Sequence, residues 1–172
     1  MGHIQFYFQK KTSSQGKVFS IEPNNLSASR LRDNIELNRL NNIDVFEIGL
    51  GEKNKEEILS IGLDPSYGKS RILKNFIDKP LTQKIHIVNG DEFIIDNKLE
   101  IPNVIKIDVE GYENEVIQGL SNTLSNPKCR VVMCEFNFVG NEDLFEKKGF
   151  EVIYTSKRGF DTHRIYRKFN SK

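Results

Sequence analysis

The sequence NVIKIDVEGYE, residues 103–113, predicts a strand that carries charge into the middle of a sheet. Its apolar residues form the β-branched run typical of a strand covered on both faces. Lys106, Asp108 and Glu110 alternate with that run, so the three charges would share one face of the strand. A buried charge without a partner is costly and usually pairs or shifts its pKa. We therefore expect a strand that is buried over its body and opens into a cleft at its end.

Composition favours a soluble globular protein of one domain. The chain has 172 residues, of which 37% are hydrophobic and 28% are charged, a balance that argues against disorder. Lys and Arg number 25 against 24 Asp and Glu, which leaves a net charge of +1. Such a balance gives no electrostatic footprint for nucleic acid or for an anionic membrane, so neither is expected as a partner.

Two further features indicate a cytoplasmic protein. No apolar run approaches the ~20 residues that span a bilayer, and the start MGHIQFYFQKK lacks the regions of a signal peptide. Cys129 and Cys134 are five positions apart in or beside one apolar run, so on one strand they would point to opposite faces. We expect neither a disulfide nor a metal pair, but reduced thiols in the core.

Apolar periodicity predicts strands that alternate with helices along the chain. Strands are expected at 17–23, 43–51, 56–63, 84–88, 103–110, 130–136, 150–155 and 161–169. Helices are expected at 24–42, 113–124 and 141–149, the first begun by an asparagine cap and the last ended by a glycine. Residues 62–83 are expected to form a long polar loop that is mobile or contacts a partner. The last two strands, joined by SKRG, suit an antiparallel pair.

This order predicts an α/β fold with a mostly parallel sheet and a C-terminal antiparallel hairpin. In such sheets ligands bind outside the carboxyl ends of the strands. Polar residues and glycines follow several predicted strands and would gather at this edge of the sheet: Glu22, Gly49, Gly51, Asp108, Glu110, Glu135 and Asn137. The sequence therefore predicts a binding site there.

Several segments resemble a known family when they are taken together and in order. They are GKVFSIEPNN, LRDNIELNRLNNIDVFEIGLGEK, NGDEF, IPNVIKIDVEGYENEVIQGL and VVMCEF, which run from about Gly16 to Phe136. This set resembles the FkbM-type S-adenosylmethionine-dependent methyltransferases (methyltransferase family 21). The resemblance implies the Rossmann-like, seven-stranded class I methyltransferase fold in a single domain over residues 1–172. It also implies S-adenosyl-L-methionine as the cofactor and O-methylation of a hydroxyl on a sugar, glycan or small-molecule acceptor.

The resemblance assigns cofactor-binding roles to residues that follow the first two strands. Glu22, with Pro23 beside it, resembles the acidic residue that holds both ribose hydroxyls of the cofactor, a task for a bidentate acceptor. The alternative is a solvated carboxylate. Gly49 and Leu50, followed by Gly51, stand where the family's loop covers the adenine, and the alternative there is a plain turn.

Asp108 resembles the family's acidic residue that faces the methionine end of the cofactor and the acceptor. A carboxylate there could orient the acceptor hydroxyl and take its proton, with Glu110 in the same turn as a second catalytic candidate. The alternative is an ion pair with Lys106. Gly111 is expected to allow close backbone approach or a positive φ, and Glu113 to favour the N-terminus of the next helix.

Other titratable residues have weaker claims to a functional role. Asp91, in NGDEF, matches an acidic position of the family, but helix capping explains it as well. Asp108, Glu135 and Asn137 could imitate an oxygen-ligand magnesium site, yet the family that the chain resembles does not need that metal, so none is expected. The histidines at 3, 86 and 163 have no ligand spacing between them, and His86 is expected to be structural.

The front of the chain departs from the family pattern. Such enzymes open with a strand that runs into a glycine-rich turn, D-x-G-A-x-x-G, whereas this chain begins MGHIQFYF. Gly2 could match one turn glycine, because Glu22 follows 20 positions later, but Gln5 stands where the closing glycine belongs. We therefore expect residues 1–16 to be a remnant of the first motif and helix, in an N-terminally truncated domain that lacks its central first strand. The alternative to an active enzyme is then a truncated or catalytically silent methyltransferase-like domain.

Overall fold

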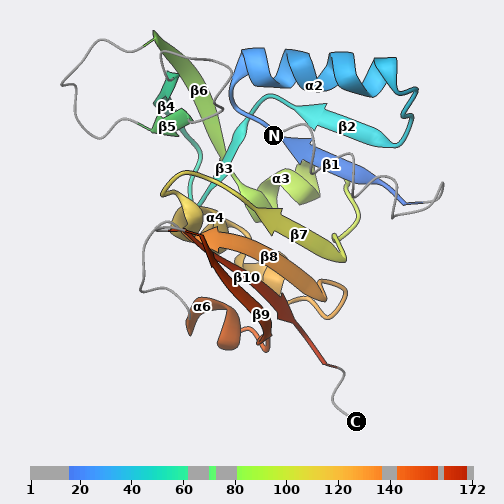
Figure 1. Cartoon of the computed structure of the whole chain (residues 1–172), viewed down its shortest axis with the longest axis vertical. Coiled ribbons are helices and arrows are strands. Elements are labelled where there is room, and N and C mark those ends of the chain that lie inside the picture. The colour runs from blue at the N-terminus through green and yellow to red at the C-terminus, as the bar shows by residue number, and fades with distance from the viewer. Residues whose placement is uncertain (1–15, 62–69, 73–80, 137–142, 159–160, 170–172) are drawn as a thin grey trace. The chain divides into compact units, whose positions relative to one another are not determined.

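The structure is a computed structural model that describes residues 16–61, 70–72, 81–136, 143–158 and 161–169 (Figure 1). The chain forms two compact units. The N-terminal unit comprises the described residues up to Gly49 and within Lys55–Ile87, and the C-terminal unit comprises those within Leu50–Asn54 and Val88–Lys172. The prediction of a single domain over the whole chain stays a prediction.

The N-terminal unit begins with a strand, a helix and a second strand. β1 (Val18–Ile21) pairs in parallel with β2 (Ile43–Phe46), and α2 (Asn25–Leu37) connects the two strands and lies along them (Figure 1). A parallel pair needs such a crossover connection, because its strands run in the same direction. These elements match the first strand, helix and strand of the sequence prediction, although β2 is shorter than expected.

Asparagine capping fixes where α2 begins. The Asn24 side chain accepts hydrogen bonds from the backbone N–H groups of Leu26 (3.0 Å) and Ser27 (3.2 Å), which have no partner inside the helix. Ala28 and Leu31 form the buried face of the helix. The predicted asparagine cap is thereby confirmed, and it holds the turn that leads out of β1.

A second sheet has the strand order β3-β6-β4-β5. Its strands are β3 (Gly49–Gly51), β4 (Lys55–Ile61), β5 (Ser70–Ile72) and β6 (Leu81–Asn89). β4, which corresponds to the strand predicted at 56–63, runs antiparallel to both β5 and β6 and so lies inside this sheet. The polar loop predicted at 62–83 is wrong where it overlaps β5 and the start of β6, because polar residues there hid the strand pattern. The rest of that loop lies outside the described residues.

The C-terminal unit is built on a sheet of order β7-β8-β10-β9. Its strands are β7 (Val104–Ile107), β8 (Val131–Phe136), β9 (Glu151–Arg158) and β10 (Asp161–Arg167). β7 and β8 are parallel, whereas β10 is antiparallel to both β8 and β9. The predicted antiparallel hairpin at the C-terminal end is therefore confirmed.

The helices described in this unit are α3 (Gly90–Asp96), α4 (Glu113–Gly119), α5 (Ser121–Ser125) and α6 (Asp143–Glu146). The helix predicted at 113–124 is thus two helices, α4 and α5, and α3 was not among the predicted helices. After α6, Gly149 has a φ of +82°, the left-handed conformation typical of a glycine C-cap, as predicted.

β8 has one buried face and one half-buried face. Val132, Cys134 and Phe136 are buried, and Phe136 packs edge-on against Phe145 with ring centroids 6.3 Å apart. Met133 and Glu135 are half-buried on the opposite face, because successive side chains of a strand point to opposite sides. Both cysteines of the chain, at 129 and 134, are buried and free, as predicted.

β7 differs from the strand predicted at 103–110. It ends at Ile107, which is 3% exposed, whereas Val104 is 44% exposed and Lys106 is exposed as well. The expectation of a strand buried over its body is therefore wrong. The β-branched residues suggested full burial, but the charges lie on a face of this unit that water can reach.

The α/β fold class is confirmed, with parallel pairs β1–β2 and β7–β8. The expectation of one mostly parallel sheet is not confirmed, because the described strands form three sheets and β4 and β10 pair with their neighbours in antiparallel fashion. None of the helices in the described part of the chain is long and apolar enough to cross a membrane.

Candidate functional site

Glu22 lies at the carboxyl end of β1, as predicted, but it is not solvated. The residue is 6% exposed, its N–H donates to the Phe46 carbonyl oxygen (3.0 Å), and its Oε1 accepts from the N–H of Asn24 (3.0 Å). Burial raises the pKa of Glu22, and the hydrogen bond from Asn24 offsets part of the rise. The turn between β1 and α2 therefore holds a buried carboxylate with one oxygen oriented by the backbone. The alternative of a solvated carboxylate is wrong.

The Gln83 side chain of β6 fixes the same turn. Its Nε2 donates to the Pro23 carbonyl oxygen (3.0 Å), and its Oε1 accepts from the N–H of Asn25 (3.1 Å). The predicted site residue Pro23 is thus held through its carbonyl group, since proline has no N–H to donate. Sequence reasoning missed Gln83, and no local signal could have found it, because it stands 60 positions from Pro23.

The glycines at 49 and 51 belong to β3, so the alternative of a plain turn is wrong. A Cβ on Gly49 would lie 2.4 Å from Cδ1 of Ile87, and a Cβ on Gly119 would lie 1.9 Å from the carbonyl oxygen of Gly51. Leu50, between the two strand glycines, is half-buried. Close packing therefore explains Gly49 and Gly119, and a contact of Gly49 or Leu50 with adenine stays a prediction.

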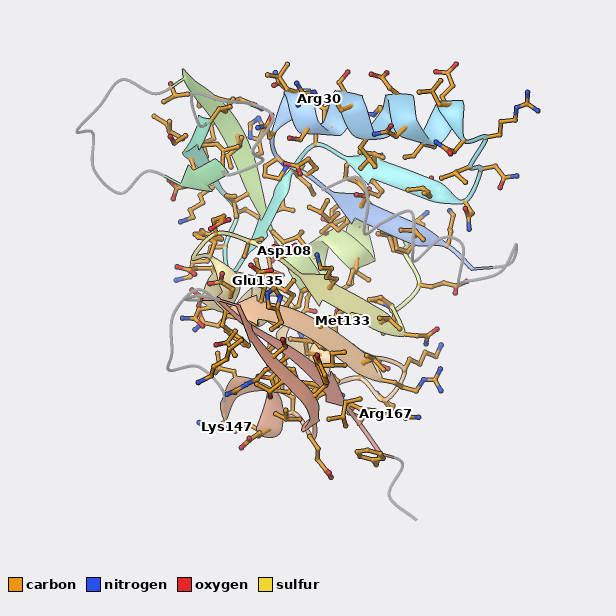
Figure 2. All side chains as sticks on the ribbon, viewed as in Figure 1. Arg30, Asp108, Met133, Glu135, Lys147 and Arg167 are labelled. Carbon is orange, nitrogen blue, oxygen red and sulfur yellow. The ribbon has the colours of Figure 1, made fainter. Side chains whose placement is uncertain are left out.

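Asp108 is the first residue after β7, and it pairs with Lys106. The Lys106 ammonium bonds to Oδ2 of Asp108, and the two side chains are 27% and 33% exposed. Figure 2 shows Asp108 beside Glu135, at the ends of the parallel strands β7 and β8. The ion pair that was the alternative for Asp108 is present. A role of Asp108 toward cofactor or acceptor stays a prediction.

The turn after Asp108 is ordered by Glu113. Gly111 has a φ of +80°, as predicted, and its N–H donates to Oε1 of Glu113 (3.0 Å). Glu113 is 7% exposed and is the first residue of α4, which confirms its predicted place at a helix N-terminus. Burial raises the pKa of Glu113, and the nearby carboxylates of Glu110 and Glu115 add to the rise. Glu110 belongs to this turn, and its catalytic role stays a prediction.

Asp91 caps a helix, but not the helix that contains it. It is buried in α3, where its Oδ1 accepts from the N–H (2.8 Å) and the hydroxyl (2.6 Å) of Thr123, and its Oδ2 accepts from the N–H of Asn122 (2.7 Å). These donors stand at the start of α5, while Asn89 caps α3 itself. The geometry therefore supports helix capping as the role of Asp91.

A carboxylate and a histidine face each other across β8 and β10. Glu135 and His163 are register partners, and His163 Nδ1 lies 3.2 Å from Glu135 Oε2, with side chains 36% exposed for His163 and 23% for Glu135. Burial raises the pKa of the neighbouring Cys134 thiol, and the negative charges of Glu113, Asp108 and Glu135 raise it further. Three carboxylates therefore gather at this end of the sheet.

The predicted site residues are divided between the two units. Glu22, Pro23 and Gly49 belong to the N-terminal unit, and Leu50, Asp108 and Glu110 belong to the C-terminal unit. Gly2, Gln5 and Asn137 lie outside the described residues. Within the described part of the chain, no group of three or more His, Cys, Asp or Glu residues could hold a metal ion.

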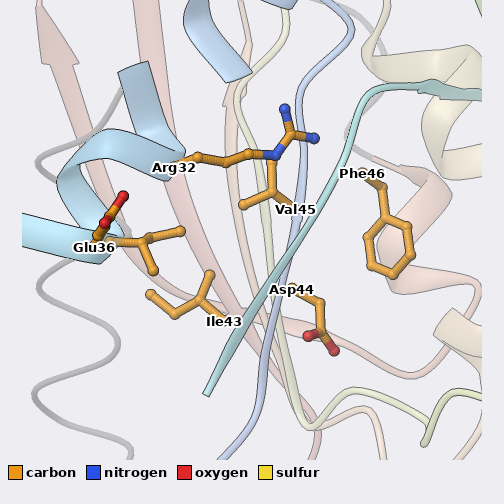
Figure 3. A pocket seen from close by; sticks show the side chains of 7 residues that line it. Arg32, Glu36, Ile43, Asp44, Val45 and Phe46 are labelled. Carbon is orange, nitrogen blue, oxygen red and sulfur yellow. The ribbon is translucent and has the colours of Figure 1, made fainter. Parts of the chain in front are cut away.

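The N-terminal unit also has a surface pocket of about 460 Å³ (Figure 3). It is lined by Arg32, Ile35 and Glu36 of α2 and by the four residues of β2. None of the predicted site residues that the structure describes lines this pocket, although Phe46, whose carbonyl oxygen accepts from the N–H of Glu22, is one of the lining residues.

The sequence pattern of the methyltransferase FkbM domain matches residues 2–169 of the chain. Among curated proteins, the hexuronic acid methyltransferase AglP of Haloferax volcanii is 31% identical over 117 residues, which are 66% of this chain and 45% of that protein. Methyltransferase 1 of Beauveria bassiana is 25% identical over 166 residues, which are 84% of this chain and 67% of that protein. The chain thus spans less than half the length of the first of these relatives. No solved structure matches the chain at a significant level.

Proposed function

This chain belongs to the methyltransferase FkbM domain family, and we propose that it is an S-adenosylmethionine-dependent O-methyltransferase that modifies a hydroxyl of a sugar or glycan. Family membership supports methyl transfer, and the name of the Haloferax volcanii relative supports a sugar acceptor. Since the chain spans 45% of that relative, its activity and its acceptor both belong to the proposal.

The observation that carries the proposal is the buried carboxylate of Glu22. A ribose presents two adjacent hydroxyls, and each can donate to one oxygen of an ionised carboxylate. Glu22 stands at the carboxyl end of β1, where α/β folds place the acid that binds a ribose, and the N–H of Asn24 orients its Oε1. These residues fit the ribose of S-adenosylmethionine. When bound, that cofactor supplies an electrophilic methyl group.

The strand orders support the class I methyltransferase fold as the particular α/β fold of this chain. In the Rossmann order 3-2-1-4-5-6, strand 1 is central. The parallel pair β2–β1, joined by α2, corresponds to strands 3-2, and the parallel pair β7–β8 corresponds to strands 4-5. Residues 1–15, which precede β1, lie outside the described part of the chain.

In the C-terminal unit, we assign Asp108 to the orientation of the acceptor hydroxyl. Lys106 engages Oδ2 of Asp108 and so fixes the carboxylate, while Oδ1 can accept a hydrogen bond from the hydroxyl. Glu113 orders the turn that follows by accepting from the N–H of Gly111 (3.0 Å), and Glu110 in that turn is a second group that can contact the acceptor. A fixed carboxylate of this kind contributes to the rate by holding the hydroxyl in one orientation.

Calorimetry with S-adenosylmethionine tests the proposal at Glu22. We expect the parent to bind, and Glu22→Ala to weaken binding by ~2–3 kcal/mol, or roughly 30- to 150-fold, because a charge-assisted hydrogen-bond acceptor is lost. Asp33, an exposed carboxylate of α2, provides the matched control, and Asp33→Ala should bind like the parent.

Equal affinities of the parent and Glu22→Ala would remove Glu22 from the cofactor site. A parent that does not bind would count against the cofactor itself. Tight binding without methyl transfer to any sugar would instead identify the chain as a catalytically silent methyltransferase-like domain.

A further inference from the structure

One face of the C-terminal sheet brings three titratable groups into register on neighbouring strands. The parallel register of β7 and β8 pairs Ile107 with Cys134, so the next positions, Asp108 and Glu135, stand side by side (Figure 2). The antiparallel register of β8 and β10 then pairs Glu135 with His163. Neighbouring strands lie ~4.8 Å apart, so the three side chains span a distance that one sugar ring can bridge.

The Glu135–His163 pair is arranged to accept a proton. His163 Nδ1 lies 3.2 Å from Glu135 Oε2, close enough for an N–H on Nδ1 to donate to that oxygen. An N–H on Nδ1 that donates to this oxygen leaves Nε2 as the ring nitrogen that can accept a proton. The His163 side chain is 36% exposed, so a substrate can reach it.

Asp108, by contrast, is already engaged. Its Oδ2 binds the ammonium of Lys106, and taking up a proton would give up that ion pair. An imidazole is the side chain best matched to accept and release a proton near neutral pH. Among the residues that the structure describes, the register partners of His163 are Glu135 on β8 and the uncharged Ser156 on β9.

From this geometry we propose that His163, held by Glu135, is the catalytic base that takes the proton of the acceptor hydroxyl. The inference rests on the proposed methyltransferase function and names its base. The hydroxyl oxygen gains the methyl group, its proton moves to Nε2 of His163, and the electron pair of the broken carbon–sulfur bond stays on the sulfur of the cofactor. Asp108 orients the hydroxyl, and Glu135 stabilises the imidazolium that forms.

This assignment also selects the acceptor chemistry. A hydroxyl must lose its proton during methyl transfer, whereas a sugar carboxylate is already ionised at neutral pH and needs no base. Asp108, Glu113 and Glu135 would in addition repel a carboxylate at this end of the sheet. The base therefore predicts a sugar hydroxyl as the group that is methylated.

The test compares the parent, His163→Ala, Glu135→Gln and, as a matched control, His86→Ala, whose side chain is 70% exposed on β6. Transfer of a labelled methyl group is measured to methyl glucuronide and to methyl glucoside, which lacks a carboxylate. We expect His163→Ala to lower kcat ~10²–10⁴-fold with cofactor affinity unchanged, and added imidazole to restore part of the rate. Glu135→Gln should lower kcat less, and His86→Ala should leave it unchanged.

The outcomes distinguish a failure of His163 as the base from a failure of the proposed methyltransferase function. An active parent whose His163→Ala variant keeps its kcat overturns the base and leaves the methyltransferase proposal in place. Loss of activity that imidazole does not restore assigns His163 a structural role and overturns the base as well. A parent that is inactive on both sugars counts against the proposed function. Nitrogen NMR of His163 then tests the Glu135–His163 pair independently of activity. A neutral ring that carries its proton on Nε2 would overturn the proposed base.

Discussion

Glu22 and Glu113 are carboxyl groups that this fold buries, the first in the turn after β1 and the second at the start of α4. Backbone N–H groups hold both, Asn24 for Glu22 and Gly111 for Glu113, yet burial raises the pKa of each. A carboxyl with a raised pKa binds its proton more tightly in the folded chain. The contribution of such a carboxyl group to stability is complete below its pKa in the unfolded chain. It is lost as the pH rises through its pKa in the folded chain. At neutral pH these groups therefore lower the stability of the fold, and their burial needs a reason other than stability.

The substitution Glu22→Gln should raise the melting temperature at neutral pH while weakening cofactor binding. The amide has no charge to desolvate and can still accept from the N–H of Asn24. The gain should appear as the pH rises above 4.5, the ordinary pKa of a glutamate, and be absent in acid, where the parent's carboxyl is protonated. Thermal melts over a pH series check this, with Asp33→Asn as the exposed control on α2. A variant less stable than the parent above neutral pH would contradict it.

The substitution Asp108→Asn tests the two contacts of that carboxylate, the proposed hydrogen bond to the acceptor and the ion pair with Lys106. Loss of a charge-assisted hydrogen bond worth ~1.5 kcal/mol should raise KM for the acceptor roughly tenfold, with cofactor affinity unchanged. The Lys106 and Asp108 side chains are 27% and 33% exposed, and water screens the pair. Loss of the pair should therefore cost less than ~1 kcal/mol of stability.

Lys106→Met is the matched control for Asp108→Asn, because it removes the same ion pair and keeps the carboxylate. Steady-state kinetics and thermal melts on the same preparations distinguish the two roles. If both variants raise KM equally, the ion pair and not the carboxylate is what the acceptor site needs. If neither variant raises KM, Asp108 has no part in the acceptor site.

At the scale of elements, the features that could be predicted are those set by neighbours in the sequence. The cap of α2 at Asn24, the positive φ of Gly111 and the hairpin of β9 and β10 all depend on residues close together in the chain. Contacts across sheets could not be predicted in this way. The pairing of His163 with Glu135 follows from the register of β8 and β10, which no local periodicity encodes.

Asp91 links α3 to α5, and its removal should lower the stability of the fold without a direct effect on the candidate site. Asp91→Ala removes the acceptor for two N–H groups and one hydroxyl at the start of α5. Loss of a cap together with unsatisfied buried donors should lower the free energy of unfolding by ~2–3 kcal/mol. Urea denaturation measures this, with Asp96→Ala, an exposed residue of the same helix α3, as the control. Equal midpoints for the two variants would show that Asp91 does not hold α5.

At the scale of the whole molecule, the proposed function draws on both units. The family match extends over residues 2–169, while Glu22 belongs to the N-terminal unit and Asp108, Glu135 and His163 belong to the C-terminal unit. Methyl transfer needs cofactor and acceptor held at the same time, with reacting atoms ~3–3.5 Å apart. Substitution of Glu22 or of His163 should therefore abolish or strongly slow transfer.

Transfer of a tritium-labelled methyl group from S-adenosylmethionine to a sugar tests the proposed activity directly. The parent is incubated with methyl glucuronide or methyl glucoside, and the label in the sugar fraction is counted. We expect labelled sugar that is stable to mild alkali, as a methyl ether is and a methyl ester is not. We also expect Glu22→Ala, in the N-terminal unit, and His163→Ala, in the C-terminal unit, each to lose most of the signal. No label in either sugar from a parent that binds the cofactor would contradict the account.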